Sequence, residues 1–312
     1  MNAPTIALIT LSDAGARLLA PLLTALPETR LYLHDSVRYN PQQEETDRNL
    51  ALRQGPTAPQ PRASKQPDRG ATGCTNAERF TKIADLTATL FPLCRGLVYA
   101  APAGVVVRAI APLIRSKYED PAVVVLDAGG RWALSLLAGH EGGANALAIR
   151  VANILGAEPV ITTTTEALKS VIVGIGCRRG TPAEQITAAI EAALAEAGVP
   201  LVEVRLLASA EVKANEPGLI AAAERLGIPL RFIPGADIRA SLRDFSHSNF
   251  VEEKVDLPAV AEPAALLAGT RTRFIRRKKS YRGITIALAR EDIPQPESPS
   301  PVPHSKTADP ER

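Results

Sequence analysis

The stretch SLLAGHEGGAN, residues 135–145, carries the pattern that decides the fold. An apolar strand pattern over 131–137 runs into a glycine, followed by His140 and Glu141, two more glycines and a helical pattern over 144–154. A short apolar run that turns directly into a helix is typical of an α/β sheet. Glycines around an ionisable pair let the backbone turn sharply and let a ligand approach closely. The stretch therefore predicts a strand-to-helix turn with a candidate site. The structural alternative is a tight turn with a solvated glutamate and a hydrogen-bonded histidine.

Strands and helices alternate on both sides of this turn. Short apolar runs predict buried strands at 5–11, 96–100, 122–126 and 159–165, and a second series begins at 171–176. Helical patterns lie between them, among them 14–26, 77–90, 105–115 and 183–197. The predicted fold class is α/β, with two α/β domains whose mostly parallel or mixed sheets are flanked by helices.

The domain boundaries follow from changes in composition. We expect an N-terminal α/β domain over 1–168, a C-terminal α/β domain over 169–291 and a disordered tail over 292–312. The N-terminal domain contains a Pro-rich insertion near 40–76 that has no apolar period and is expected to be disordered.

Helix boundaries are marked by capping residues. Ser12 or Asp13 is expected to cap the first helix. Thr181 and Glu184 predict a capping box around Pro182 at the start of the helix that ends at Gly198.

Composition excludes several classes of protein. The chain has 312 residues, of which 22% are charged, and its net charge of +3 is too small to indicate nucleic-acid binding. No apolar run approaches the roughly 20 residues of a membrane span. Cys74, Cys94 and Cys177 are scattered, which argues against disulfides and a zinc site and for a reducing compartment. We expect a cytoplasmic protein without a metal site.

The central turn offers acid–base chemistry. His140 is a candidate general base near neutral pH, with Glu141 orienting it or donating a proton. The N–H groups of Gly142 and Gly143, and those of the following helix, are expected to face a bound oxyanion or anionic ligand. In α/β sheets, ligands bind at the carboxyl ends of strands, where this turn is expected to lie. No nucleophile elbow accompanies it, so covalent catalysis has no support.

Other polar residues are candidates for binding an anionic ligand. Arg178 and Arg179 precede a helix N-terminus, where carboxylates or phosphates bind, although a solvated basic turn is the alternative. The glycines around them are spaced one residue too long for a dinucleotide fingerprint, so we reject NAD binding. Lys213 and Glu216 lie in a loop and are equally consistent with a salt-bridged turn. The candidate substrate-binding residues are Arg108, Gly142, Gly143, Asn145, Thr163, Thr164, Arg178, Arg179, Lys213 and Glu216.

Several motifs together resemble a known family. Segments 104–108 with 111–113, 120–125, 136–145 and 161–164 resemble the N-terminal domain of the cobalt-precorrin-5A hydrolase (cobalamin biosynthesis protein CbiG) family. Segments 174–180, 216–219, 261–266 and 283–290, and Ser209 with Lys213, resemble its C-terminal domain. The motifs are in the family's order over about 85–168 and 171–290. The middle domain usual in that family is missing, because Thr165 leads into Val171 within a few residues, and Glu141 replaces a commonly apolar residue.

The resemblance implies a reaction in anaerobic cobalamin (vitamin B12) biosynthesis. Family members open the δ-lactone of a ring-contracted cobalt tetrapyrrole and release acetaldehyde, giving cobalt-precorrin-5B. The implied partner is this substrate, which carries its own cobalt, so no protein cofactor is expected. A homodimer is possible, and neither nucleic acid nor membrane is an expected partner. The alternative is a non-catalytic protein that binds or delivers a corrinoid intermediate, because the C-terminal domain also resembles a companion protein of the aerobic pathway.

Overall fold

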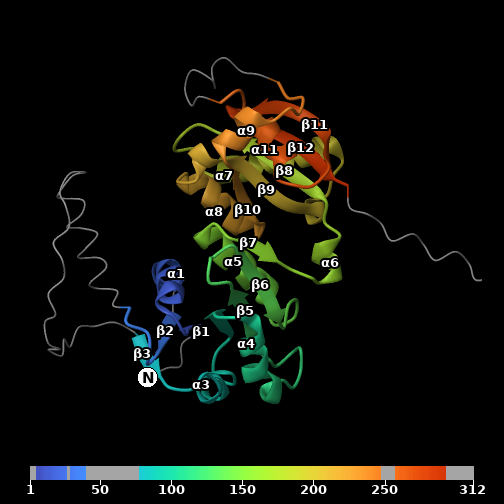
Figure 1. Ribbon diagram of the computed structural model, residues 1–312. Coiled ribbons are helices and arrows are strands. Elements are labelled where there is room, and N and C mark those ends of the chain that lie inside the picture. The colour runs from blue at the N-terminus through green and yellow to red at the C-terminus, as the bar shows by residue number, and fades with distance from the viewer. Residues whose placement is uncertain (1–4, 27–28, 40–76, 247–256, 293–312) are drawn as a thin grey trace, which may run out of the picture.

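The strands form two sheets, one above the other in Figure 1. A computed structural model of the chain describes residues 5–26, 29–39, 77–246 and 257–292. Within these residues, one sheet has seven strands in the order β3-β2-β1-β4-β5-β6-β7, and the other has five in the order β10-β9-β8-β12-β11. Both sheets are mixed and flanked by helices, which confirms the predicted fold class. The insertion near 40–76 and the tail beyond 292 lie outside the described residues, and the domain boundary at 168/169 stays a prediction.

The first unit consists of the seven-stranded sheet and its helices. Its strands are β1 (Ile6–Thr10), β2 (Thr29–His34), β3 (Ala77–Phe80), β4 (Gly96–Ala100), β5 (Ala122–Leu126), β6 (Trp132–Leu137) and β7 (Glu158–Val160). Its helices are α1 (Asp13–Ala25), α3 (Ile83–Leu90), α4 (Ala103–Ile110), α5 (Ala144–Leu155), α6 (Thr164–Ala167) and the short 3-10 helix η1 (Ala111–Leu113). Buried side chains of α1 and α5 pack in one core cluster on one face of the sheet. Buried side chains of α3 and α4 pack in a second cluster on the opposite face. The sheet is therefore covered on both faces.

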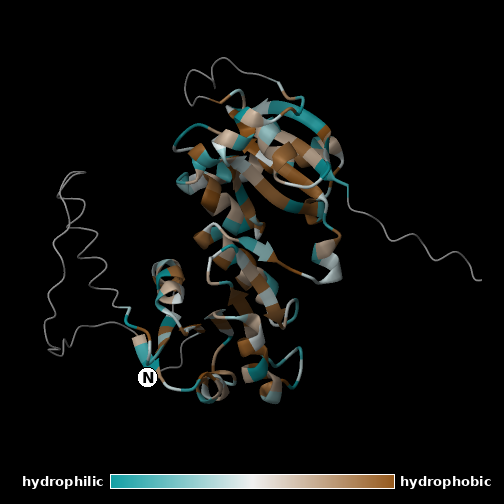
Figure 2. Ribbon diagram, in the orientation of Figure 1, coloured by the Kyte–Doolittle hydropathy of each residue, from teal (hydrophilic) through white to brown (hydrophobic). Residues whose placement is uncertain are grey.

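The second unit consists of the five-stranded sheet and its helices. Its strands are β8 (Val171–Gly176), β9 (Val204–Ala210), β10 (Leu230–Ile233), β11 (Thr272–Tyr281) and β12 (Ile284–Glu291). Its helices are α7 (Ala183–Ala197), α8 (Pro217–Leu226), α9 (Gly235–Ala240) and α11 (Ala261–Leu267), with 3-10 helices η2 (Leu201–Glu203) and η3 (Glu211–Lys213). Helices α7 and α8 cover one face, while α9 and α11 cover the other. Hydrophobic residues follow the central strands of both sheets, whereas the edge strand β11 is largely hydrophilic (Figure 2).

A polar contact joins the two units. The side chain of Asn153 on α5 donates to the carbonyl oxygen of Ile228 at 3.2 Å and accepts from the N–H of Leu230 at 2.9 Å. Arg231 on β10 forms an ion pair with Glu158 on β7. The edge strand β7 of the first sheet therefore faces the start of β10 in the second.

Part of the predicted helix over 77–90 is a strand. Residues Ala77–Phe80 form β3, which pairs in parallel with β2, and the helix α3 begins only at Ile83. Phe80 is buried against the core, while the two residues before it are exposed. The prediction was wrong here because pairing with β2, rather than local propensity, decides the conformation of these four residues.

The capping predictions had two different outcomes. Ser12 is the N-cap of α1, and its hydroxyl accepts from the N–H of Gly15 at 3.1 Å, as predicted. The capping box of α7 was wrong, because Pro182 is the N-cap and Thr181 donates its hydroxyl to the carbonyl oxygen of Arg178 at 2.7 Å. Glu184 forms an ion pair with Arg225 on α8 instead of reaching back to the cap.

Buried Glu262 anchors the edge strand of the second sheet. Its fully buried carboxylate accepts from the N–H of Ser246 at 2.5 Å and of Lys278 at 2.9 Å, and from the Ser246 hydroxyl at 3.1 Å. The register between β11 and β12 shifts between Arg276 and Lys279, next to the Lys278 N–H that reaches Glu262. Burial by itself would raise the pKa of Glu262, but these donors outweigh it and lower the pKa below its ordinary value of 4.5.

The lowered pKa of Glu262 gives a prediction for stability. Because the folded-state pKa lies below the unfolded one, this group stabilises the fold above about pH 4.5, and that contribution falls as the pH drops toward the folded-state pKa. We expect Glu262→Gln to lower the free energy of unfolding at neutral pH by about 1–3 kcal/mol. Urea unfolding of both proteins over a pH series checks this. The two stabilities should converge as the solution becomes acidic, and a constant difference at every pH would contradict the prediction.

Candidate functional site

The central turn folds back onto the helix that follows it. Ala138 and Gly143 have positive φ angles of 56° and 84°. The N–H groups of Ala144 and Asn145 donate to the carbonyl oxygens of Ala138 and Gly139 at 3.1 and 2.9 Å. The expectation that the first N–H groups of α5 are open to a ligand is therefore wrong for these two. The N–H groups of Gly142 and Gly143 have no hydrogen-bond partner within the described ranges.

Close packing explains the glycine in the middle of this turn. A Cβ on Gly142 would overlap the Cβ of Ala138 and lie 3.1 Å from the carbonyl oxygen of Asp120. The glycine is therefore required by the neighbouring backbone, and not only by a ligand's approach.

His140 and Glu141 are both exposed at the tip of the turn. Among the described residues, His140 makes no hydrogen bond, so the alternative of a hydrogen-bonded structural histidine is not met. The carboxylate of Glu141 lies 2.6 Å from the Nζ of Lys117, and this hydrogen bond lowers the pKa of Glu141. A carboxyl group with a lowered pKa is ionised near neutral pH, which argues against Glu141 as the proton donor.

Asn145 and Thr163 are brought together by the fold. The side chain of Asn145 is buried, accepts from the Ser135 hydroxyl at 2.8 Å and donates to the Thr163 hydroxyl at 2.9 Å. Asn145 therefore ties the turn to the residue that precedes α6, and its polar atoms are already used. Thr164, the first residue of α6, is exposed.

The direction of β6 places this turn at an unexpected edge of the sheet. Strand β6 is antiparallel to β5 and parallel to β7, whereas β1 to β5 all run the same way. The turn therefore lies beside the loop that enters β5 and opposite the carboxyl ends of β1, β4 and β5. The expectation that it shares their edge is wrong, because the short β5–β6 connection reverses the chain.

That loop contributes residues that the sequence patterns did not single out. It contains Lys117, the partner of Glu141, and Tyr118, whose ring lies 4.9 Å from the Lys117 Nζ. The last turn of α4, which carries the predicted residue Arg108, precedes this loop. No spacing rule links Lys117 to Glu141, since 24 residues separate them in the chain.

The predicted residues of the second unit form a separate group. Arg178 and Arg179 follow β8 and are exposed, and neither forms an ion pair with any residue that the structure describes. Glu216 is only 4% exposed, accepts from the N–H of Gly180 at 2.7 Å and lies 3.5 Å from the Nζ of Lys213. Glu216 therefore braces the loop that carries the two arginines rather than facing a ligand. The alternative of a salt-bridged turn holds for Lys213 and Glu216.

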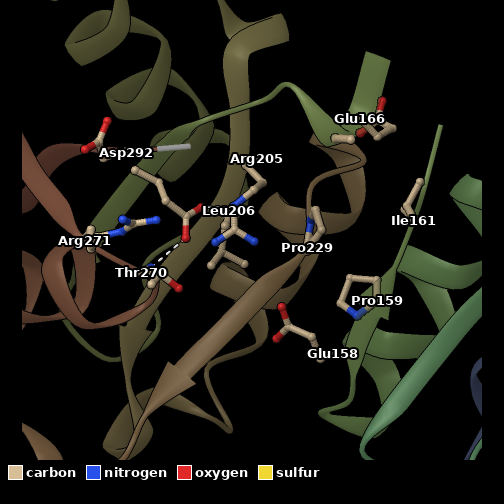
Figure 3. A pocket seen from close by; sticks show the side chains of 12 residues that line it. Glu158, Pro159, Ile161, Glu166, Arg205, Leu206, Pro229, Thr270, Arg271 and Asp292 are labelled. Atoms are coloured by element: carbon tan, nitrogen blue, oxygen red, sulfur yellow. Dashed lines mark hydrogen bonds and ion pairs between the residues drawn. The ribbon is translucent and has the colours of Figure 1, made fainter. Parts of the chain in front are cut away.

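A cavity of about 450 Å³ lies between the two units (Figure 3). The first unit contributes Glu158, Pro159, Ile161, Glu166 and Ala167, and the second contributes Arg205, Leu206, Pro229, Thr270, Arg271, Glu291 and Asp292. Figure 3 shows Arg205 near the middle of this lining, and its guanidinium lies 2.9 Å from Glu291. Three of the four carboxylates in the lining are in ion pairs, Glu158 with Arg231, Glu166 with Lys169 and Glu291 with Arg205. The lining contains none of the predicted site residues.

The cavity lies at the opposite edge of the second sheet from Arg178 and Arg179. Its lining comes from the amino ends of the parallel strands β9 and β10, whereas the arginines follow the carboxyl end of β8. The turn that carries His140 is nearer to the cavity than these arginines are. Asn145, at the end of that turn, contacts Thr163, and Glu166, three residues further along the chain, lines the cavity. The fold therefore brings the predicted residues together as two groups, one in each unit.

Within the described ranges, no three His, Cys, Asp or Glu side chains gather in a way that would hold a metal ion. No helix in the same ranges is both long and apolar enough to cross a membrane. Cys94 and Cys177 are free thiols.

Two family descriptions match the chain in succession. "Cobalamin synthesis G N-terminal" matches residues 85–166, and "Cobalamin synthesis G C-terminus" matches residues 171–289. Together the two matches cover the greater part of both units.

The curated proteins to which the chain is similar include two hydrolases and a smaller protein. The cobalt-precorrin-5A hydrolase of Salmonella typhimurium is 25% identical over 297 residues, covering 66% of this chain and 84% of the relative. The protein of the same name from Priestia megaterium is 26% identical over 314 residues, covering 69% and 83%. Protein CobE of a Sinorhizobium species is 38% identical over 128 residues, covering 40% and 83%.

The two hydrolases carry residues that this chain lacks. The alignments contain 297 and 314 positions, but this chain contributes only 66% and 69% of its 312 residues to them. The other positions are filled by residues of the hydrolases alone. Helix α6 ends at Ala167 and β8 begins at Val171, which leaves no space for a further domain between the two matched regions.

Proposed function

Because the chain belongs to the cobalamin synthesis G family, we propose that it is a cobalt-precorrin-5A hydrolase of cobalamin biosynthesis. The reaction opens the δ-lactone of a ring-contracted cobalt tetrapyrrole and releases acetaldehyde, giving cobalt-precorrin-5B. The observation that carries this proposal is the succession of both family matches along residues 85–289. The two curated hydrolases support it, since the chain covers more than four fifths of each.

The chemistry requires a group that accepts protons at two stages. Water adds to the lactone carbonyl and the ester C–O bond breaks, which leaves a carboxylic acid and an alcohol. Loss of the alcohol proton then lets the C–C bond to the macrocycle break. Acetaldehyde leaves, and the electron pair stays on the macrocycle, where a proton replaces the lost group. We assign the proton-accepting role to His140, whose exposed imidazole has no hydrogen bond in the described part of the chain.

The neighbouring groups suit the charge that develops at the lactone carbonyl. The N–H groups of Gly142 and Gly143 follow His140 directly and have no partner among the described residues. Donors of this kind stabilise the oxyanion formed when water adds to a carbonyl. The Nζ of Lys117, 2.6 Å from the Glu141 carboxylate, offsets the negative charge of that carboxylate beside the turn. Cobalt belongs to the substrate in this proposal, and no protein cofactor is invoked.

The proposal is tested with the purified chain and cobalt-precorrin-5A. Acetaldehyde is measured as NADH oxidation by added alcohol dehydrogenase, and the corrinoid product by mass spectrometry. We expect one acetaldehyde per substrate and a product that has gained one water and lost one acetaldehyde. An intact lactone after prolonged incubation with active, folded protein would contradict the proposal.

A non-catalytic corrinoid carrier is the second candidate. The 38% identity to CobE supports it, because the alignment covers 83% of CobE with only about the length of one unit, so that relative has no counterpart of the other unit. A carrier would bind the substrate without releasing acetaldehyde, so the same experiment separates the two. A homodimer and a cytoplasmic location stay predictions for either candidate.

A further inference from the structure

Exposed apolar side chains occur along the segment that leads to Lys117, the partner of Glu141 in the His140 turn. Val107 on α4, Ile114 after η1 and Tyr118 in the following loop have 45%, 46% and 72% of their surface exposed. Large apolar side chains seldom gather in one exposed segment unless that segment contacts another molecule. We call residues 107–118 the docking surface.

Basic side chains alternate with these apolar ones. Arg108 and Arg115 are exposed, and neither forms an ion pair with a residue that the structure describes. Lys117 is the third cation of the segment, paired with Glu141. The docking surface contains no acidic residue, and the buried carboxylate of Asp120 beyond it accepts from the N–H groups of Arg115 and Ser116. Exposed Glu119 is the nearest remaining acid in this loop.

One contact of the docking surface, and one of the residue two positions beyond it, place this surface beside the proposed base. Lys117 reaches Glu141, the residue that follows His140, at 2.6 Å. The backbone of Asp120 packs against Gly142, with the Asp120 carbonyl oxygen 3.1 Å from the position of a Cβ on that glycine. A ligand lying on Ile114 and Tyr118 is therefore next to the tip of the turn.

The cavity between the units is a poorer place for the same ligand. Of the two arginines in its lining, Arg205 is already paired with Glu291, so the cavity offers a polycarboxylate little unpaired positive charge. Its volume of about 450 Å³ also suits a small organic molecule better than a tetrapyrrole macrocycle.

We propose that the docking surface binds the tetrapyrrole substrate. An apolar face of the macrocycle rests on Val107, Ile114 and Tyr118, while carboxylates at its rim bind Arg108, Arg115 and Lys117. This arrangement presents the lactone to His140. The inference rests on the proposed function, and it assigns the substrate to one surface of the first unit.

The test compares charged and neutral forms of one macrocycle. The probes are a cobalt corrin heptacarboxylate and its methyl ester, titrated against the full chain and followed by visible absorbance. We expect the acid to bind more tightly than the ester. Arg108→Gln and Arg115→Gln should each weaken binding of the acid by about tenfold, the effect of one lost charge-assisted hydrogen bond, and leave the ester unchanged. The matched control is Arg131→Gln, an exposed arginine paired with Asp127 at the opposite edge of β5.

The outcomes separate this inference from the function on which it rests. If both arginine variants bind the acid as the control does while the wild type releases acetaldehyde, the docking surface is wrong and the function stands. If the wild type releases no acetaldehyde, the proposed function fails. Ile114→Asp provides a further readout, because it should weaken binding of both probes. If it instead dissociates a dimer and leaves binding unchanged, a second copy of the chain occupies this surface and the inference is overturned.

Discussion

His140→Ala is expected to lower kcat for acetaldehyde release by about 10²–10⁴-fold, the usual contribution of general acid–base catalysis. The imidazole is exposed at the tip of the turn, so its loss leaves no cavity and removes no hydrogen bond to a described residue. The effect should therefore appear in kcat, with KM and the free energy of unfolding nearly unchanged. Added imidazole should restore part of the activity, which a purely structural role would not allow.

His34→Ala is the matched control. The ring nitrogens of His34 lie 2.7 Å from the Ser36 hydroxyl and 2.9 Å from the carbonyl oxygen of Thr81, and the residue ends β2 at the other edge of the sheet. We expect this variant to lose some stability and to keep its kcat. Equal activity of His140→Ala and the wild type would show that another group accepts the proton.

Gly174→Ala is expected to disrupt the second unit. Helix α11 crosses β8 at this residue, and a Cβ there would overlap the carbonyl oxygen of Ala261 and lie 2.8 Å from the N and Cβ atoms of Ala265. The obstacle is backbone, which moves only if the whole helix shifts. We expect the free energy of unfolding to fall by at least about 3 kcal/mol, the upper range for overpacked cores. Urea unfolding monitored by circular dichroism checks this.

Gly104→Ala is the control for the same chemical change. A Cβ at Gly104 in α4 would meet only the Arg108 guanidinium, at 3.8 Å or more, and its φ angle is not positive. The added methyl should leave stability unchanged or raise it by up to about 1 kcal/mol, since alanine favours helix over glycine. Similar losses in both variants would mean that α11 does not constrain β8 in the way described.

Local signals accounted for much of the fold. Buried strands such as β4 and β5 were predicted because a short apolar run needs no distant information to be recognised. The end of α7 was predicted for a similar reason, since Gly198 adopts the positive φ angle that favours glycine. The α7 capping box failed because Glu184 has a partner from another helix, Arg225.

The candidate site was predicted less completely than the fold. The turn itself, with His140, is a local feature and was recognised from its glycines. The roles of its neighbours were not, because Asn145 binds Thr163 and Glu141 binds Lys117 from other parts of the chain. Glu216 was expected to contact substrate, yet its buried carboxylate binds the N–H of Gly180. A polar side chain's role depends on which groups reach it, and this information is not local.

The sequence by itself determined the α/β class, the order of most elements and the glycine-framed turn that presents His140. These features depend on hydrophobic period and backbone conformation within a few residues. Tertiary structure decided that β3 is a strand, that β6 runs against β5, and that the turn therefore meets the loop of Lys117 and Tyr118. The physical reason is that strand pairing and side-chain contacts join residues far apart in the chain, so their free energy exists only once both partners are in place.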